Sequence, residues 1–372
     1  MRGSIQRKGK TYYAVIPLSG RRVWFKGGTK RDAERVLAER LSEINQGTYQ
    51  ESSKKTFKEF SEFWLKNYAE VNLKSSTLSS YRDIIERLLD PTWGHLRLST
   101  LTTGNLQRYV SERLKTVSPK TVINEIVVIK EMFKHAHRWS YIRYNPAEHL
   151  ERPKLIRPEI EILTPEEVDK LLAKASNHYL LAFQTCVLTG LRAGELWGLR
   201  WSDTDWNSFQ LHIRQSLWKG QFQTPKSRYS IRRVDIPEQL AHELKRWRLV
   251  SPMSKEDLVF PSPEGNSTCH DNMVKRHFDP ALRRAGLRHV SFHSLRHTNA
   301  SMRIQAGQNI KYIQTQLGHS SIKVTLDIYG HLFNDANFNR QQVRLLQISL
   351  ESVRNSSGSV EITDTSLDEH QL

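Results

Sequence analysis

The amino-acid sequence predicts a mainly helical protein of several domains, with small β elements in two places. Three observations support this fold class. Apolar side chains recur at helical spacing through most of the chain, and four short runs have the alternation or the β-branched and aromatic content of strands. Two polar segments separate these blocks. With 372 residues, of which 38% are hydrophobic, the chain is long enough for two or three folded domains.

The first fifty residues predict a small sheet followed by a helix. Residues 12–16 and 22–26 have strand composition, and Ser19-Gly20 between them is a turn signal. Thr29 is a candidate N-cap for a helix with an apolar face. This segment carries eleven basic and four acidic side chains, so we expect a polyanionic partner. A basic hairpin that only assists folding is the alternative.

Residues 46–55 are polar and are interpreted as a linker, after which residues 56–150 predict a bundle of four helices. The apolar stripes of these helices predict a hydrophobic core, not a cofactor site. Polar side chains between the stripes are candidates for contacts to DNA phosphates, because helix N-termini and hydroxyl or basic groups commonly make such contacts. These candidates are Lys74, Ser76, Thr77, Arg82, Lys120 and Thr121.

A second linker, residues 151–162, contains two prolines and precedes the helix-start signal Thr164-Pro165-Glu166-Glu167. Residues 160–350 then mix helices with a short β region, in which residues 209–213 and 232–236 alternate like strands. Residues 351–372 hold five acidic residues and one basic residue, and we expect this tail to be disordered.

Composition favours a nucleic-acid partner. Lys plus Arg (56) exceed Asp plus Glu (39), which gives a formal net charge of +17. A merely basic solvated surface is the alternative. The two cysteines lack metal-binding spacing, so neither a zinc site nor a disulfide framework is indicated, and Cys186 is expected in the core. Neither a signal peptide nor a membrane span is recognised, so we expect a reducing, DNA-containing compartment: the cytoplasm, with the protein associated with the nucleoid.

Six residues in the C-terminal half have the chemistry needed to attack a phosphodiester. The transition state carries extra negative charge on the non-bridging oxygens, which arginine binds with its planar fork. A phenol becomes nucleophilic as it loses its proton, and a lysine can protonate the leaving oxygen. This chemistry requires no metal ion. The six residues are Arg192, Lys226, His293, Arg296, His319 and Tyr329.

Two further features accompany this set. Glu195 follows Arg192 by three residues and shares its helical face, where it can hold the guanidinium in place; a weak surface ion pair is the alternative. The histidines lack the carboxylate or cysteine partners of a metal site. His297 and His331 are interpreted as structural or rim residues outside the catalytic set.

The order and local patterns of these residues resemble the tyrosine recombinases, specifically the phage-type integrases. The resemblance covers nearly the whole chain and rests on TGLRAGEL at 189–196, HSLRH at 293–297, LGHS at 317–320 and the tyrosine at 329. Each local match is short, but six in the right order are specific. Glu195 occupies a position that is acidic in the family and supports the site.

The resemblance assigns a role to each catalytic candidate. Tyr329 would attack the scissile phosphate to give a 3′-phosphotyrosyl link and a free 5′-hydroxyl. Lys226, on the turn between the two predicted strands of the β region, would protonate the leaving oxygen, and His293 would assist proton transfer. The residues that would hold the non-bridging oxygens are Arg192, Arg296 and His319.

The resemblance also gives each predicted domain a role. Residues 1–50 would be an arm-type DNA-binding domain with a three-stranded sheet, residues 56–150 a core-binding domain, and residues 160–350 the catalytic domain. The residues expected to face a DNA groove from the sheet are Arg21, Arg22, Trp24 and Lys26. The apolar segment that follows Tyr329 is expected to dock on a neighbouring protomer.

The implied partners are double-stranded DNA, with core and arm sites, and three further copies of the chain in a tetramer on two duplexes. DNA-bending and directionality factors, encoded by the host or by the element, are further candidates, and no cofactor is expected. The sequence therefore predicts a site-specific recombinase of a phage or other mobile element. A type IB topoisomerase and a DNA-binding regulator with an idle site are the alternatives; the small basic N-terminal segment and the complete residue set favour the recombinase.

Overall fold

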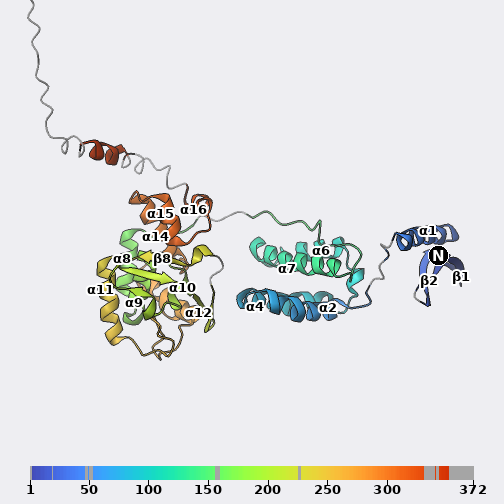
Figure 1. Ribbon diagram of the computed structural model, residues 1–372, viewed down its shortest axis with the longest axis horizontal. Helices are drawn as coiled ribbons and strands as arrows, with labels where there is room; N and C mark the ends of the chain where they lie inside the picture. The colour runs from blue at the N-terminus through green and yellow to red at the C-terminus, as the bar shows by residue number, and fades with distance from the viewer. Residues whose placement is uncertain are drawn as a thin grey trace, which may run out of the picture. The chain divides into compact units, whose positions relative to one another are not determined.

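The computed structural model describes residues 2–18, 20–46, 49, 53–155, 160–224, 228–330, 340 and 343–351. The chain divides into two compact units, Met1–Arg157 and Pro158–Leu372. Helices predominate in both units and strands form only small sheets, which confirms the predicted fold class (Figure 1). The finer division into an arm, a core-binding and a catalytic domain stays a prediction, as does the acidic tail, which lies outside the described residues beyond residue 351.

The first unit begins with a three-stranded antiparallel sheet, as expected. Its strands, in their hydrogen-bonded order, are β1 (Ser4–Lys8), β2 (Thr11–Leu18) and β3 (Arg21–Gly28). Strand composition alone indicates only β2 and β3, because β1 has the largely polar sequence SIQRK. Helix α1 (Lys30–Asn45) packs on β2 and β3. The hydroxyl of Thr29 accepts a hydrogen bond from the backbone N–H of Asp32 at 3.2 Å, so Thr29 caps α1 as predicted.

Four helical rods follow, which confirms the predicted bundle. Two of them contain a π-helical turn. The rods are α2 (Phe57–Trp64) with η1 (Leu65–Ala69) and α3 (Glu70–Asn72); α4 (Ser75–Ile84) with η2 (Ile85–Leu89) and α5 (Asp90–Trp93); α6 (Thr103–Arg113); and α7 (Pro119–Arg138). Their apolar stripes form one buried cluster around Phe57, Trp64 and Phe133, each at most 1% exposed.

The second unit surrounds a small sheet with helices (Figure 1). Its helices are α8 (Pro165–Lys174), α9 (Asn177–Thr189), α10 (Ala193–Trp197), α11 (Glu238–Val250), α12 (His270–Met273), α13 (Asp279–Arg284), α14 (Ser294–Gln305), α15 (Ile310–Leu317) and α16 (Ile322–Tyr329). Thr164 and Glu167 form the predicted capping box at the start of α8. Cys186 is buried, and its thiol donates to the carbonyl of Leu191, which confirms its place in the core.

The β region of this unit is more elaborate than the sequence indicates. Strands β4 (Thr204–Asp205), β5 (Gln210–Ile213) and β8 (Arg232–Asp235) form one antiparallel sheet. A second hairpin, of β6 (Ser216–Trp218) and β7 (Gln221–Gln223), lies between β5 and β8 in the sequence. The prediction of a single turn between residues 209–213 and 232–236, which form β5 and β8, is therefore wrong. Strands β6 and β7 have only three residues each, SLW and QFQ, so they are too short to show a recognisable strand pattern.

Within the part of the chain that the structure describes, every helix is too short or too polar to cross a membrane.

Candidate active site

Arg192 stands where α9 gives way to α10. Helix α9 ends at Gly190, whose φ of 67° lies in the left-handed region that glycine adopts without strain. A Cβ atom on Gly190 would lie 2.6 Å from the Leu317 side chain and 2.7 Å from that of Asn299, so the tight approach also requires glycine. The turn places Arg192 at the N-cap position of α10.

The side chain of Glu195 accepts hydrogen bonds from both the backbone and the side chain of Arg192. The Arg192 N–H donates to Oε2 of Glu195 at 3.0 Å, and Nη1 donates to Oε1 at 2.9 Å. The predicted pairing of these two residues is therefore confirmed. Glu195 is only 6% exposed, so the alternative of a weak surface ion pair does not apply.

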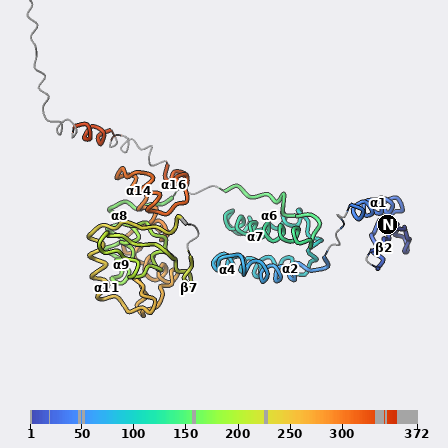
Figure 2. Tube along the Cα trace, in the orientation of Figure 1, coloured from blue at the N-terminus to red at the C-terminus, as the bar shows by residue number. Residues whose placement is uncertain are grey.

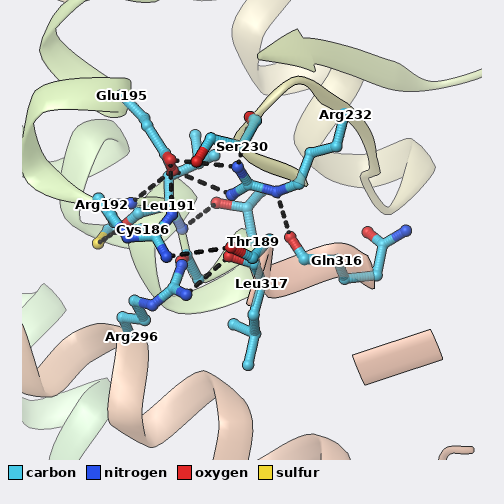
Figure 3. A network of polar contacts seen from close by, with 12 residues as sticks. Cys186, Thr189, Leu191, Arg192, Glu195, Ser230, Arg232, Arg296, Gln316 and Leu317 are labelled. Atoms are coloured by element: carbon cyan, nitrogen blue, oxygen red, sulfur yellow. Dashed lines mark hydrogen bonds and ion pairs between the residues drawn. The ribbon is translucent and has the colours of Figure 1, made fainter. Parts of the chain in front are cut away.

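A second cation, absent from the residues predicted for the site, contacts this carboxylate. Arg232, on β8, donates from Nη1 and Nη2 to the two oxygens of Glu195 at 3.1 and 3.0 Å (Figure 3). Its Nε donates to the carbonyl of Gln316 at 2.7 Å, and its side chain is 3% exposed. A signal was available: in an alternating strand, Arg232 falls on the same face as buried Val234, and a charged residue there needs a partner.

The two arginines determine the ionisation of Glu195. Burial alone would raise its pKa, but Arg232 and then Arg192 outweigh this effect and lower the pKa to about 2. The carboxylate is therefore charged at neutral pH, and it anchors two guanidinium groups that come from different elements.

Arg296, on α14, donates both to the turn that ends α9 and to the turn that ends α15. It is 2% exposed, and it donates from Nη1 to the Gly190 carbonyl at 2.6 Å and from Nη2 to the Leu317 carbonyl at 2.7 Å. Arg192 donates from Nη2 to the next carbonyl, that of Gly318, at 3.2 Å. Burial, followed by the nearby Arg192, lowers the pKa of Arg296 to about 9, so its charge persists at neutral pH. Arg192 and Arg296 therefore converge on the turn at residues 317–318, where α15 ends.

That turn carries His319. Helix α15 ends at Gly318, which has φ 65°, and a Cβ there would lie 2.9 Å from Nη1 of Arg232. His319 is 7% exposed, and its Nδ1 lies 2.8 Å from the hydroxyl of Thr325. Burial, followed by the surrounding arginines, lowers the pKa of His319 to about 3, so the ring is neutral at neutral pH.

Tyr329 ends α16, which follows this turn. Its ring is 2% exposed and packs among Ala300, Ile304, Ile313 and Leu317. Figures 1 and 2 show α16 beside α14, and the two helices meet where the Tyr329 hydroxyl lies 2.6 Å from Nδ1 of His297. Burial raises the pKa of Tyr329 to about 12 although Arg296 opposes this shift, so the phenol is protonated at neutral pH.

His297, which the sequence patterns place outside the catalytic set, contacts the candidate nucleophile directly. It follows Arg296 on α14 and lies four residues after His293, so the helical spacing puts both rings on one face. The His293 ring lies 4.8 Å from that of His297 and is exposed, at the position that precedes α14. Partial burial, followed by His297 and Arg296, lowers the pKa of His293.

The remaining site predictions are placed as follows. Lys226 lies outside the described residues, in the segment between β7 and β8. Arg22, Trp24 and Lys26 alternate along β3 and are exposed, so they lie on one accessible face; Arg21 is exposed at the start of that strand.

The candidates in the helical bundle gather mostly at helix N-termini. Lys74, Ser76 and Thr77 lie at the start of α4, and Lys120 and Thr121 in the first turn of α7. Arg82 instead lies further along α4, where it forms an exposed ion pair of 2.8 Å with Glu70. Contacts of these groups to DNA stay a prediction.

Comparison with known proteins agrees with this geometry. Residues 161–335 match the profile of the phage integrase family, and residues 56–114 match that of the phage integrase N-terminal SAM-like domain. A XerC-like tyrosine recombinase of Caldanaerobacter subterraneus subsp. tengcongensis is 28% identical over 88% of this chain and 94% of its own length. The ICEBs1 integrase of Bacillus subtilis is 26% identical over 86% and 92%.

Solved structures show the same fold. The Tn1549 transposon integrase, solved in complex with a circular intermediate DNA, superposes with a TM-score of 0.66 at 20% identity, over 78% of this chain and 99% of that one. A lambda integrase tetramer bound to a Holliday junction superposes with a TM-score of 0.59 at 17% identity, over 85% and 95%.

The fold, the converging arginines and the adjacent tyrosine are the features expected of a DNA strand-transfer enzyme. The chain belongs to the phage integrase family of tyrosine recombinases, the enzymes of site-specific DNA recombination and integration.

Proposed function

We propose that the protein cleaves and rejoins DNA through a 3′-phosphotyrosyl link to Tyr329, without a metal ion or ATP. The observation that supports this most directly is the convergence of Arg192 and Arg296 on the carbonyls of Gly318 and Leu317, at 3.2 and 2.7 Å. These carbonyls are neutral acceptors. A phosphate is charged and binds guanidinium more strongly, so it can take over these donors when DNA enters.

The donors suit the charge that develops at phosphorus. Arg192 and Arg296 supply positive charge and N–H groups for the non-bridging oxygens, where a preorganised donor stabilises the transition state most. His319 supplies a third donor. When the Thr325 hydroxyl donates to Nδ1 of His319, the ring hydrogen lies on Nε2, and that nitrogen can donate to a phosphate oxygen.

The covalent step is balanced as follows. The oxygen of Tyr329 bonds to phosphorus as its phenolic proton passes to a nearby base, and the bond from phosphorus to the 5′ oxygen breaks. Lys226 protonates that leaving oxygen, and His293 assists proton transfer. The phosphotyrosyl ester keeps the energy of the broken bond, so attack by a 5′-hydroxyl of the second duplex reseals DNA without ATP. Glu195 acts through Arg192, which it holds in place.

The proposed partners are double-stranded DNA and three further copies of the chain. The net charge of +17 and the exposed side chains of β3 support contacts to core and arm DNA. Residues 343–351 are helical, and their apolar side chains are 44–68% exposed, which supports docking on a neighbouring protomer. The lambda integrase tetramer on a Holliday junction supports a four-subunit assembly. DNA-bending and directionality factors complete the proposed set.

A nicked suicide substrate tests the proposal, because the short strand released on cleavage diffuses away and traps the covalent protein. The wild-type chain should form an adduct, and Tyr329→Phe should bind the same DNA but form none, since only the nucleophilic oxygen is lost. Adduct formation by the phenylalanine variant would reject Tyr329 as the nucleophile. Joining of two defined duplexes separates recombination from the simple relaxation that a topoisomerase performs.

A further inference from the structure

We propose that His297 is the general base that accepts the phenolic proton of Tyr329 as the phenol attacks phosphorus. The inference rests on the proposed function, since it requires Tyr329 to be the nucleophile. It assigns a catalytic role to a residue that neither the sequence pattern nor the comparisons single out.

The geometry places the acceptor at the reacting oxygen. Nδ1 of His297 lies 2.6 Å from the Tyr329 hydroxyl, within the range of a strong O–H···N hydrogen bond. The centres of the two rings are 5.7 Å apart and the ring planes are inclined at 59°, so the edge of the imidazole meets the hydroxyl of the phenol. The ring of His293, to which the family resemblance gives proton transfer, packs against the His297 ring with 4.8 Å between the ring centres.

The backbone fixes this contact relative to the phosphate donors. His297 follows Arg296 on α14, so one helix presents a guanidinium to the phosphate and an imidazole to the nucleophile. The ring of Tyr329 is buried among apolar side chains of α14 and α15, which holds the hydroxyl near Nδ1. A base that is preorganised in this way needs no search for the proton at the moment of attack.

The ionisation states agree with this role. Burial, followed by Arg296, lowers the pKa of His297 to about 4, so its ring is neutral and able to accept at neutral pH. The charged or titratable groups that interact with it among the described residues are His293, Arg296, His319 and Tyr329. A phosphodiester bound to the arginines adds negative charge beside the ring, which raises the affinity of His297 for the proton in the complex.

The proton balance of the step is complete. The Tyr329 proton moves to Nδ1 of His297 as the O–P bond forms, and the leaving 5′ oxygen takes its proton from Lys226. Religation reverses both transfers, so His297 returns the proton to the phenol. The step needs no further reactant.

Two substitutions separate basicity from packing. His297→Asn keeps a polar acceptor close to the position of Nδ1 but cannot hold a proton, and His297→Ala removes the group. Both should lower the single-turnover cleavage rate at pH 7 by about a hundredfold or more, the usual contribution of a general base. His289→Ala is the matched control, since that histidine is 77% exposed in the loop before α14, and its rate should stay at the wild-type level.

A substrate whose bridging 5′ oxygen is replaced by sulfur isolates the nucleophile's side of the reaction, because a thiolate leaves without an acid. This substrate should restore cleavage to Lys226→Ala but not to His297→Asn. In the histidine variants Tyr329 must ionise before it attacks. Because its pKa is about 12, their cleavage rate should rise about tenfold per pH unit between pH 6 and 9.

The wild-type chain supplies a test that does not depend on the folding of a variant. Because His297 has a low pKa and stays able to accept a proton over this range, cleavage of the sulfur-bridged substrate by the wild-type chain should be nearly independent of pH between 6 and 9. A tenfold rise per unit in the wild type, or wild-type cleavage of this substrate by His297→Asn, would overturn the proposal. Tyr329→Phe separates the role of Tyr329 as nucleophile from the role of His297 as its base. If Tyr329→Phe forms an adduct, Tyr329 is not the nucleophile. If Tyr329→Phe is inactive but the His297 variants cleave at the wild-type rate, only the role of His297 is rejected.

Discussion

Replacement of Arg232 by alanine tests the buried charge cluster that holds the site together. The side chain makes four hydrogen bonds, two to Glu195 and one each to the carbonyls of Ser230 and Gln316. Removing one partner of a buried ion pair costs about 3–5 kcal/mol, because the other charge is left uncompensated. Arg192 still contacts Glu195, so we expect a loss near the lower end, about 3 kcal/mol of the free energy of unfolding.

The assay is urea unfolding of the full-length chain, followed by hydrogen exchange of peptides from the second unit so that the two units are measured separately. Arg233→Ala is the matched control: it removes the same side chain from the next position of β8, where the residue is exposed. The control should change stability by no more than about 0.5 kcal/mol. A second variant, Arg232→Ala with Glu195→Gln, removes the unpaired charge and should recover part of the loss.

Equal unfolding midpoints for Arg232→Ala and Arg233→Ala, with equal slopes in urea, would refute the reasoning. The carboxylate would then be compensated by Arg192 alone. Cleavage of a suicide substrate below the unfolding transition gives a second readout. It should slow in Arg232→Ala, because Glu195 and the turn at residues 316–318 lose their common anchor, and stay unchanged in the control.

Three further predictions concern pH, catalysis and domain roles. The pKa of Glu195 is depressed to about 2 in the folded chain from an ordinary value of 4.5, so its contribution to stability, about 3 kcal/mol, is present above pH 4.5 and lost as the pH falls towards 2. Acid titration of stability should therefore be shallower in Glu195→Gln than in the wild type. Arg192→Ala and Arg296→Ala should each slow cleavage by about a hundredfold or more, and wild-type cleavage should persist in EDTA; strict dependence on a divalent metal would contradict the scheme. Deletion of residues 1–50 should leave cleavage of a core site largely unchanged but weaken binding to a distal site and flatten its salt dependence. If core cleavage and full recombination fall together while circular dichroism shows a folded protein, the separate role of this segment is wrong.

Much of the architecture follows from local signals. Thr29 and Thr164 cap the helices that the sequence assigns to them, because a side-chain oxygen near an unpaired backbone N–H acts within three residues. The apolar stripes of residues 56–150 predict four helices for the same reason: helical spacing is a property of neighbouring residues. The pairing of Arg192 with Glu195 is equally local.

Other features depend on contacts between distant parts of the chain. The π-helical turns and the β6–β7 hairpin have no clear pattern of their own, because packing in the folded unit selects them. His297 and Tyr329 are separated by 32 residues, and Arg232 and Glu195 by 37. Neither pairing has a signature in sequence spacing, although a charged residue on the buried face of β8 indicates that a partner exists.

Local sequence patterns are enough to predict the kinds of residue available for catalysis, their order, and most of the helices that carry them, since propensity, capping and periodicity act over short distances. Which of these groups meet depends on how distant segments pack. This packing brings Arg192, Arg296 and the turn before His319 together, adds Arg232 to Glu195, and puts His297 against Tyr329. Burial makes each of these charges and hydroxyls require a partner, and the packing of helices from distant parts of the chain supplies it.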